Sequence, residues 1–158
     1  MAKFVGAFDN KIDAKGRVSV PADFRAAVAG ASFDGVVAFP AFTGDAIEAG
    51  GLDRLQEIQA MIDGLDPYGD EREAFELAVM SQARKLAFDA DGRITLPGEL
   101  IDCAGLNGRA AFVGRGPYFQ IWRPEAYAEK MAEAQARARE LRGLLHTPNR
   151  QTSGAGAP

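Results

Sequence analysis

The chain has 158 residues, a formal net charge of −4, and apolar and charged fractions of 47 % and 25 %, which are ordinary for a globular protein. No run approaches the roughly 18 apolar residues of a membrane span, and Asp9 interrupts the apolar N-terminus, so we expect no membrane segment and no secretory signal. The single cysteine, Cys103, cannot form an internal disulfide and fits a reducing cytoplasm, where we expect it to be a small buried residue.

The acidic residues are concentrated in the middle of the chain. Residues 46–80 carry nine acids against two arginines, whereas residues 1–30 and residues 81–123 each have a net charge of +2. Because the local potential steers a polyanion, the negative total does not exclude nucleic acid as a partner.

The first 50 residues read as a β-rich unit. We predict a strand over residues 3–12, a turn over 13–16, a second strand over 17–20, a helix over 22–28 that begins at Pro21, and two further strands, over 36–39 and 45–49. Gly16 lies where a tight hairpin needs a positive φ, and Asp13 can accept hydrogen bonds from the turn backbone.

A helical hairpin follows. Residues 52–63 place one apolar stripe on a helix, and Asp70, with Glu73 three positions later, predicts the N-cap of a second helix that carries Phe75, Val79 and Met80. The stripe of the first helix consists of Leu55, Ile58, Gln59 and Ile62.

The β-rich plan then recurs. We predict strands over residues 85–88 and 93–96 around a turn at 89–92, a helix from Pro97 to about Cys103, and strands over 110–114 and 118–122. Trp122 and Tyr118 are expected in the core or at a subunit contact.

A last helix begins at Pro124. Its apolar residues recur with a 3.5 period, which suits a seam against another helix; the alternative is a partly exposed terminal helix packed on its own domain. The seam residues are Tyr127, Met131, Ala134, Ala138, Leu141 and Leu145. Residues 146–158 are almost free of apolar side chains, and we expect them to be disordered.

Two segments of the chain have nearly the same sequence. DAKGRVSVPADFR at 13–25 recurs as DADGRITLPGELI at 89–101, a constant offset of 76 positions. Such a repeat indicates two copies of one supersecondary unit, so fold and function are read for each copy.

Each copy places an arginine directly after its turn glycine. Arg17 follows Gly16, and Arg93 follows Gly92. An arginine fork can bind guanine O6 and N7, and a two-stranded β-ribbon can enter the major groove, so both arginines are candidates for reading DNA. The alternative is that each braces its hairpin by pairing with Asp13 or Asp89; the two roles are compatible, because the carboxylate could hold the guanidinium in place.

Lysines near the first turn are candidates for further DNA contacts. Lys15 lies at the turn tip, but its counterpart is Asp91, so we expect the first copy to dominate the contact. Weaker candidates for phosphate contacts are Lys3, Lys11, Arg25, Arg84 and Lys85.

The sequence offers little for catalysis. The only histidine, His146, lies in the expected tail, and no His/Cys cluster suggests a metal site. We therefore expect that the protein is not an enzyme and that it has no catalytic residue, no metal site and no cofactor.

The repeated D-x-x-G-R-[VI]-[ST]-[VL]-P resembles the turn of the AbrB/SpoVT class of bacterial DNA-binding proteins, and two copies joined by helices resemble the MraZ family over about residues 1–145. The resemblance implies an α+β, mainly β fold: a tandem, pseudo-symmetric swapped-hairpin β-barrel with a helical connector and a C-terminal helix. The implied limits are 7–54 and 83–126 for the two AbrB-like domains, 55–82 for the connector, 127–145 for the helix and 146–158 for the tail.

The resemblance also implies a function. The family's members regulate transcription beside a cell-division and cell-wall gene cluster, and assemble into rings that recognise short G-rich direct repeats in double-stranded DNA. We therefore expect a cytoplasmic, nucleoid-associated regulator whose partners are DNA and its own copies. The main alternative is an antitoxin-like module of the same fold whose partner is a protein, and an enzyme with paired carboxylates is a distant third.

Overall fold

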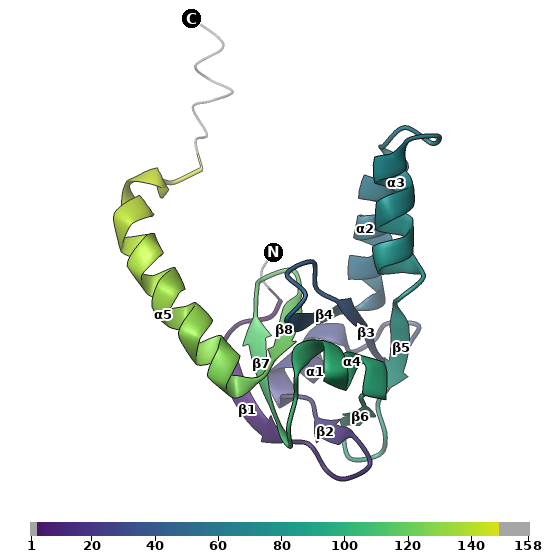
Figure 1. Ribbon diagram of the computed structural model, residues 1–158. Helices are drawn as coiled ribbons and strands as arrows, with labels where there is room; N and C mark the ends of the chain where they lie inside the picture. The colour runs from purple at the N-terminus through teal and green to yellow at the C-terminus, as the bar shows by residue number, and fades with distance from the viewer. Residues whose placement is uncertain (1–2, 149–158) are drawn as a thin grey trace, which may run out of the picture. The chain divides into compact units, whose positions relative to one another are not determined.

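Eight β-strands and five α-helices lie within residues 3–148, the part of the chain that this computed structural model describes (Figure 1). The strands form antiparallel pairs throughout, so the expectation of an α+β, mainly β architecture is confirmed at this level. The chain divides into two compact units, the first ending at Ala126 and the second beginning at Tyr127. We predicted a disordered tail over residues 146–158, and of these, residues 149–158 lie outside the described part.

The two copies contain the same elements in the same order. The first copy comprises β1 (Ala7–Lys11), β2 (Arg17–Ser19), α1 (Ala22–Val28), β3 (Gly35–Pro40) and β4 (Ala46–Gly50). The second comprises β5 (Arg84–Ala87), β6 (Arg93–Thr95), α4 (Gly98–Ala104), β7 (Arg109–Gly114) and β8 (Phe119–Trp122). The predicted first strand is too long: it begins at Ala7 rather than Lys3, because Gly6 has a φ of +96° that interrupts extended backbone.

The strands of the two copies interleave in one six-stranded sheet, whose order is β1-β7-β8-β4-β3-β5. Each copy's first strand therefore pairs with the other copy's third strand, β1 with β7 and β5 with β3. The fourth strands, β4 and β8, pair with each other at the centre of the sheet. Neither copy completes a sheet alone, so the duplicated sequence folds as one body.

A separate two-stranded ribbon joins β2 to β6, with Val18 opposite Ile94 at its midpoint. This corrects the prediction of a hairpin within each copy: in the first copy only one bridge, Ile12 to Val18, joins the strands on either side of the turn. Val18 and Ile94 are each 1 % exposed, so pairing across the copies lets both β-branched side chains enter one core.

The main core is shared by both copies. Phe4 and Phe24 of the first copy pack against Phe119 of the second, with ring centroids 5.1 and 5.0 Å from that of Phe119, and all three are essentially inaccessible to solvent. Because α1 and α4 each contribute buried side chains to this cluster, the helix after each ribbon strand is held firmly in place.

The connector is a helical hairpin of α2 (Leu52–Asp63) and α3 (Asp70–Phe75), continued by a π-helical turn (Glu76–Met80). Ile58 and Ile62 are buried as the stripe predicted. The predicted N-cap is wrong by one residue: Gly69 is the N-cap, and Asp70 is the first helical residue, without a capping bond from its side chain. Phe75 is 39 % exposed and contacts Phe42 instead of the core.

The C-terminal helix is shorter than predicted. Helix α5 runs over Pro124–Leu141 and gives way to a 3₁₀ turn at Arg142–Leu144. Leu145 has extended backbone and therefore leaves the predicted seam, since Gly143 weakens a further helical turn. No residue of α5 is buried.

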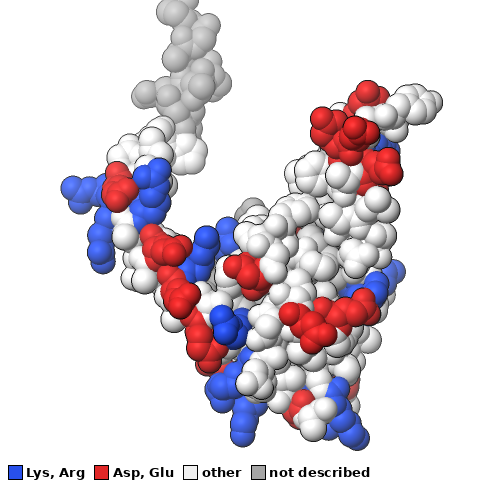
Figure 2. All heavy atoms as spheres, in the orientation of Figure 1, with Lys and Arg blue, Asp and Glu red and all other residues white. Residues whose placement is uncertain are grey.

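The charges within the first unit follow the sequence pattern. Figure 2 shows acidic side chains gathered at the far end of the α2–α3 hairpin, and Lys and Arg side chains, mixed with a few acids, at the end that carries β2. Across residues 3–148, the structure has no helix with the length and apolar character needed to span a bilayer.

Candidate nucleic-acid interface

The two repeated turns have nearly identical hydrogen bonds. In the first, Asp13 Oδ1 accepts the backbone N–H groups of Lys15 (2.9 Å) and Arg17 (2.8 Å), while Oδ2 accepts Arg17 Nε at 2.6 Å. In the second, Asp89 Oδ1 accepts those of Asp91 and Arg93 (both 2.9 Å), while Oδ2 accepts Arg93 Nε at 2.8 Å. Each aspartate thus closes its turn and orients its arginine.

The turn glycines have the backbone conformation that the sequence predicted. Gly16 has a φ of +82° and Gly92 a φ of +75°, in the left-handed region that side chains with a β-carbon rarely enter. The tight change of direction lets the aspartate reach the amide four residues further on.

The backbone N–H of Arg17 is the main cause that lowers the pKa of Asp13 below its ordinary value, with smaller contributions from the Arg17 side chain and the Lys15 amide. The backbone N–H of Arg93 lowers the pKa of Asp89 in the same way. Both carboxylates are therefore ionised at neutral pH and attract the guanidinium that each one orients.

The ribbon brings the two arginines together. Arg17 lies opposite Thr95, and Arg93 lies opposite Ser19, so the arginines are diagonal neighbours on the face opposite the buried Val18 and Ile94. Both line one open cavity of about 400 Å³, whose other lining residues are Lys11, Ile12, Asp13 and Ser19. The surface is therefore formed by both copies.

The two arginines differ in the freedom of their terminal nitrogens. Within the described residues, Arg17 is bound only through Nε, so both of its Nη groups remain free. Arg93 also directs Nη2 towards Asp91 Oδ2, at 3.4 Å. The charge reversal at the second tip therefore occupies part of the second guanidinium.

The lysine candidates separate into two groups. Lys11 lies in the cavity beside Arg17, and Lys15 is exposed at the turn tip, where its side chain has no ion pair with any residue from 3 to 148. Lys3 lies near Gly116, beyond the opposite end of β1, and its ammonium pairs with Asp53. The structure thus brings together the candidates Lys11, Lys15, Arg17 and Arg93 but not Lys3.

The remaining basic candidates have varied surroundings. Arg84 pairs with Glu99 at 3.0 Å, and Lys85 lies 5.9 Å from the centroid of the Phe33 ring. Arg25 lies in a second open cavity, against the turn of the other copy.

Sequence reasoning missed a buried polar cluster on the central strands. Glu48 is 8 % exposed and pairs with Arg54 at 3.5 Å, and Arg54 lies over the Tyr118 ring. Burial raises the pKa of Glu48, and the attraction of Arg54 only partly opposes this. The signal in the sequence was a lone acid in the apolar run of β4. Trp122 is buried, as expected, whereas Tyr118 is only partly buried.

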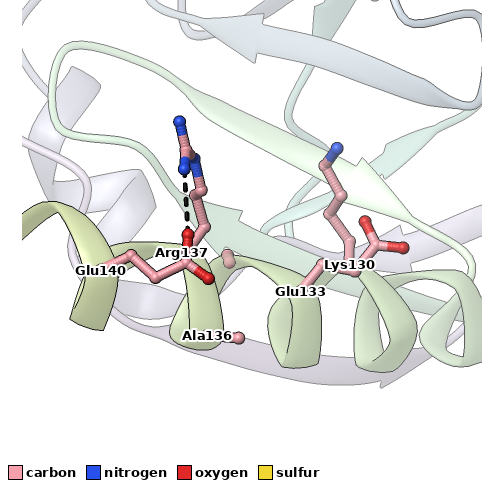
Figure 3. Close-up of a pocket in the computed structure, with 6 residues that line it drawn as sticks. Lys130, Glu133, Ala136, Arg137 and Glu140 are labelled. Atoms are coloured by element: carbon pink, nitrogen blue, oxygen red, sulfur yellow. Dashed lines mark hydrogen bonds and ion pairs between the residues drawn. The ribbon is translucent and has the colours of Figure 1, made fainter.

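The hollow in Figure 3 is formed by helix α5 alone. Its charged side chains project from successive turns, and Arg137 pairs with Glu140 at 3.0 Å. These are solvated charges on an exposed helix, with little to hold a small ligand.

Cys103 is only partly buried, contrary to the expectation of full burial, and its Sγ lies 3.8 Å from the carbonyl oxygen of Ala46. Burial is the main cause that raises the pKa of this thiol, so it is protonated at neutral pH. No group of three or more potential ligands within residues 3–148 could hold a metal ion.

Comparison with known proteins identifies close relatives. A family model described as "MraZ protein, putative antitoxin-like" matches residues 79–145. A "Transcriptional regulator MraZ" of Rickettsia bellii is 41 % identical over 149 residues, covering 94 % of this chain and 97 % of that protein. One of Parvibaculum lavamentivorans is 46 % identical over 146 residues, covering 92 % and 91 % respectively. The names of these relatives describe regulators, not enzymes.

Proposed function

This chain belongs to the MraZ family of transcriptional regulators, and we propose that it acts by binding double-stranded DNA sequence-specifically. It binds as a ring-shaped homo-oligomer, and its target is a set of short, G-rich direct repeats beside a cell-division and cell-wall gene cluster. It works in the cytoplasm, in association with the nucleoid.

The observation that best supports DNA reading is the arginine pair on the β2–β6 ribbon. A ribbon of two strands fits the major groove, and a guanidinium with free Nη groups can donate to guanine O6 and N7 together. Diagonal neighbours on such a ribbon are roughly 7–8 Å apart, which is about two base steps along one strand. One chain therefore suits two guanines in one short element.

The other site residues have supporting roles. Lys11 and Lys15 contact phosphates near the arginines, while the aspartate and glycine of each turn hold the arginines in position. These turn residues are Asp13, Gly16, Asp89 and Gly92. Lys3 is the weakest member of the set because Asp53 already holds its ammonium.

We further propose that the fold is a swapped-hairpin barrel of the AbrB type, with domains at residues 7–54 and 83–126. The interleaving of the two copies in the sheet and the joint β2–β6 ribbon support this assignment. The connector at 55–82 and the helix at 127–145 would then be additions to the barrel.

The small number of cations in each chain supports the proposed assembly into a ring. A chain of net charge −4 with few free cations at its reading surface binds one site weakly. Several chains on adjacent repeats convert weak contacts into a much stronger combined affinity.

The proposal is tested by Arg17→Ala and Arg93→Ala, made separately, with fluorescence anisotropy on a duplex of GGG-containing repeats and on a scrambled duplex. Each should weaken binding to the repeats by roughly 5- to 150-fold, the equivalent of 1–3 kcal/mol for one lost bidentate contact. Arg17→Lys is the matched control: it keeps the charge and loses the fork, so it should bind both duplexes about equally. Unchanged repeat affinity in folded variants would overturn the reading role.

An antitoxin-like module with a protein partner is the second candidate, because the matching family model carries the words "antitoxin-like". Under that function the arginines serve only to brace the turns. The two alanine variants would then lose thermal stability without a selective loss of repeat binding.

A further inference from the structure

Each turn is attached to the other copy. The backbone N–H of Val20 donates to the carbonyl of Gly92 at 3.2 Å, and that of Leu96 donates to the carbonyl of Gly16 at 2.9 Å. The first turn therefore rests on the second copy, and the second turn rests on the first.

The helices that follow the ribbon strands complete this exchange. Ile101 of α4 lies under the first turn, 3.6 Å from the position that a β-carbon on Gly16 would occupy. Its counterpart, Arg25 of α1, lies against the second turn, where a β-carbon on Gly92 would overlap the guanidinium. Equivalent places thus hold an apolar side chain at one turn and a cation at the other.

Among residues 3–148, the charge of Arg25 has no partner. Its guanidinium has no hydrogen bond or ion pair with the residues that the structure describes, whereas Arg17 and Arg93 are both held by aspartates. It lines an open cavity of about 470 Å³ beside the second turn, together with Asp34, Asp89 and Asp91. Arg25 is a partly exposed residue, and a guanidinium without an acceptor can bind an anion from outside even though acids are nearby.

The second turn lacks cations that the first one has. Lys11 and Lys15 of the first copy correspond to Ala87 and Asp91 of the second, while Ile101 corresponds to Arg25. We propose that Arg25 is a DNA-phosphate contact of the second turn, and that it supplies from the first copy the positive charge that Asp91 removes. This inference rests on the proposed function. It assigns Arg25, a residue of the first copy, to the DNA contacts of the second turn.

The test gives the second turn the side chains that surround the first turn. Arg25→Ile gives the second turn the apolar neighbour that the first turn has, and Asp91→Lys gives it the lysine tip. A phosphate contact is independent of sequence, so the probe is a 40-bp duplex of mixed sequence titrated at several KCl concentrations. Arg137→Ile, on α5, removes one charge from an exposed ion pair and serves as the control for net charge.

For Arg25→Ile we expect weaker binding and a plot of log affinity against log salt that is shallower by about one. The double variant, Arg25→Ile with Asp91→Lys, should regain both the affinity and the slope, and Arg25→Lys should keep most of them. Arg137→Ile should leave the slope unchanged.

Two results would overturn the inference. One is unchanged affinity and slope in Arg25→Ile; the other is a loss that Asp91→Lys does not restore, accompanied by a lower Tm, which identifies Arg25 as a brace for the turn. Failure of the proposed function is distinguishable, because the unmodified protein would then bind neither this duplex nor the G-rich repeats.

Discussion

At the scale of single residues, Asp13 and Asp89 each perform two tasks with two oxygens. Oδ1 accepts two backbone amides of the turn, and Oδ2 binds only Nε of the arginine. Neither aspartate therefore occupies the terminal nitrogens of its arginine, although Asp91 approaches one of those of Arg93. The two roles considered for the arginines, reading DNA and bracing the turn, are thus compatible in one geometry. A rigidly held guanidinium loses less side-chain entropy when it binds.

The lowered pKa values make a prediction about acid stability. Because the folded-state pKa of Asp13 lies below the unfolded value near 3.8, its ionised form stabilises the fold above that pH, and this contribution is lost as the pH falls through the lowered pKa. The urea midpoint of the unmodified protein should fall more steeply below about pH 4 than that of Asp13→Asn. The raised pKa of Glu48 acts in the opposite direction, but it is common to both proteins and cancels in the comparison. Parallel midpoint profiles from pH 6 to pH 2 would contradict the prediction.

Residues in the repeated motif could be assigned from sequence because the motif is local. The aspartate, glycine and arginine of each turn lie within five positions, and their bonds are between neighbours. The place of Arg25 could not be assigned in this way, since Gly92 is distant in sequence and approaches only after the copies interleave. The Glu48–Arg54 pair joins β4 to α2 and has no repeat to reveal it.

At the scale of elements, the unit of structure is not the sequence repeat. The elements of each copy were predicted in their correct order, because turn glycines, prolines and β-branched residues mark them locally. The partners of the first two strands of each copy were not, because those strands could pair either within their own copy or with the other one. The choice between hairpin and cross-copy ribbon depends on which arrangement buries Val18 and Ile94 together, and only the whole core decides that.

The cross-copy ribbon predicts an energetic coupling. Val18→Ala should lower the free energy of unfolding by about 2 kcal/mol and Ile94→Val by about 1 kcal/mol, from lost burial and residual cavity. Since the two side chains face each other, the double variant should depart from the sum of these effects by about 0.5 kcal/mol or more. Ile62→Val, in the separate α2 cluster, is the control and should add to Val18→Ala within about 0.5 kcal/mol. Additive effects of Val18 and Ile94 in urea titrations would contradict the coupling.

At the scale of the whole molecule, the proposed avidity needs chains that meet the same side of the DNA. Neighbouring chains in a ring face one side of the duplex only when their repeats lie about one helical turn, roughly 10 bp, apart. The arrangement of repeats then matters as much as the sequence of each one.

The prediction is tested on duplexes with two G-rich repeats at centre-to-centre spacings of 10 and 15 bp. The half-turn offset should lower the affinity by at least roughly tenfold, since the second contact becomes unreachable without deforming the DNA. The mass of the complex on each duplex should be measured in the same experiment. Equal affinities at both spacings, with an unchanged mass, would contradict assembly on successive repeats.

The unequal tips of the two turns affect the direction in which a chain can bind its DNA site. A dimer of identical halves has a true two-fold axis and reads a site equally well from either direction. Here the halves are joined in one chain, so one tip can hold Lys15 while the other holds Asp91. The proposed DNA-binding surface therefore has two different ends. If neighbouring chains bind in the same orientation, as we propose, their target elements must be direct repeats that all point the same way.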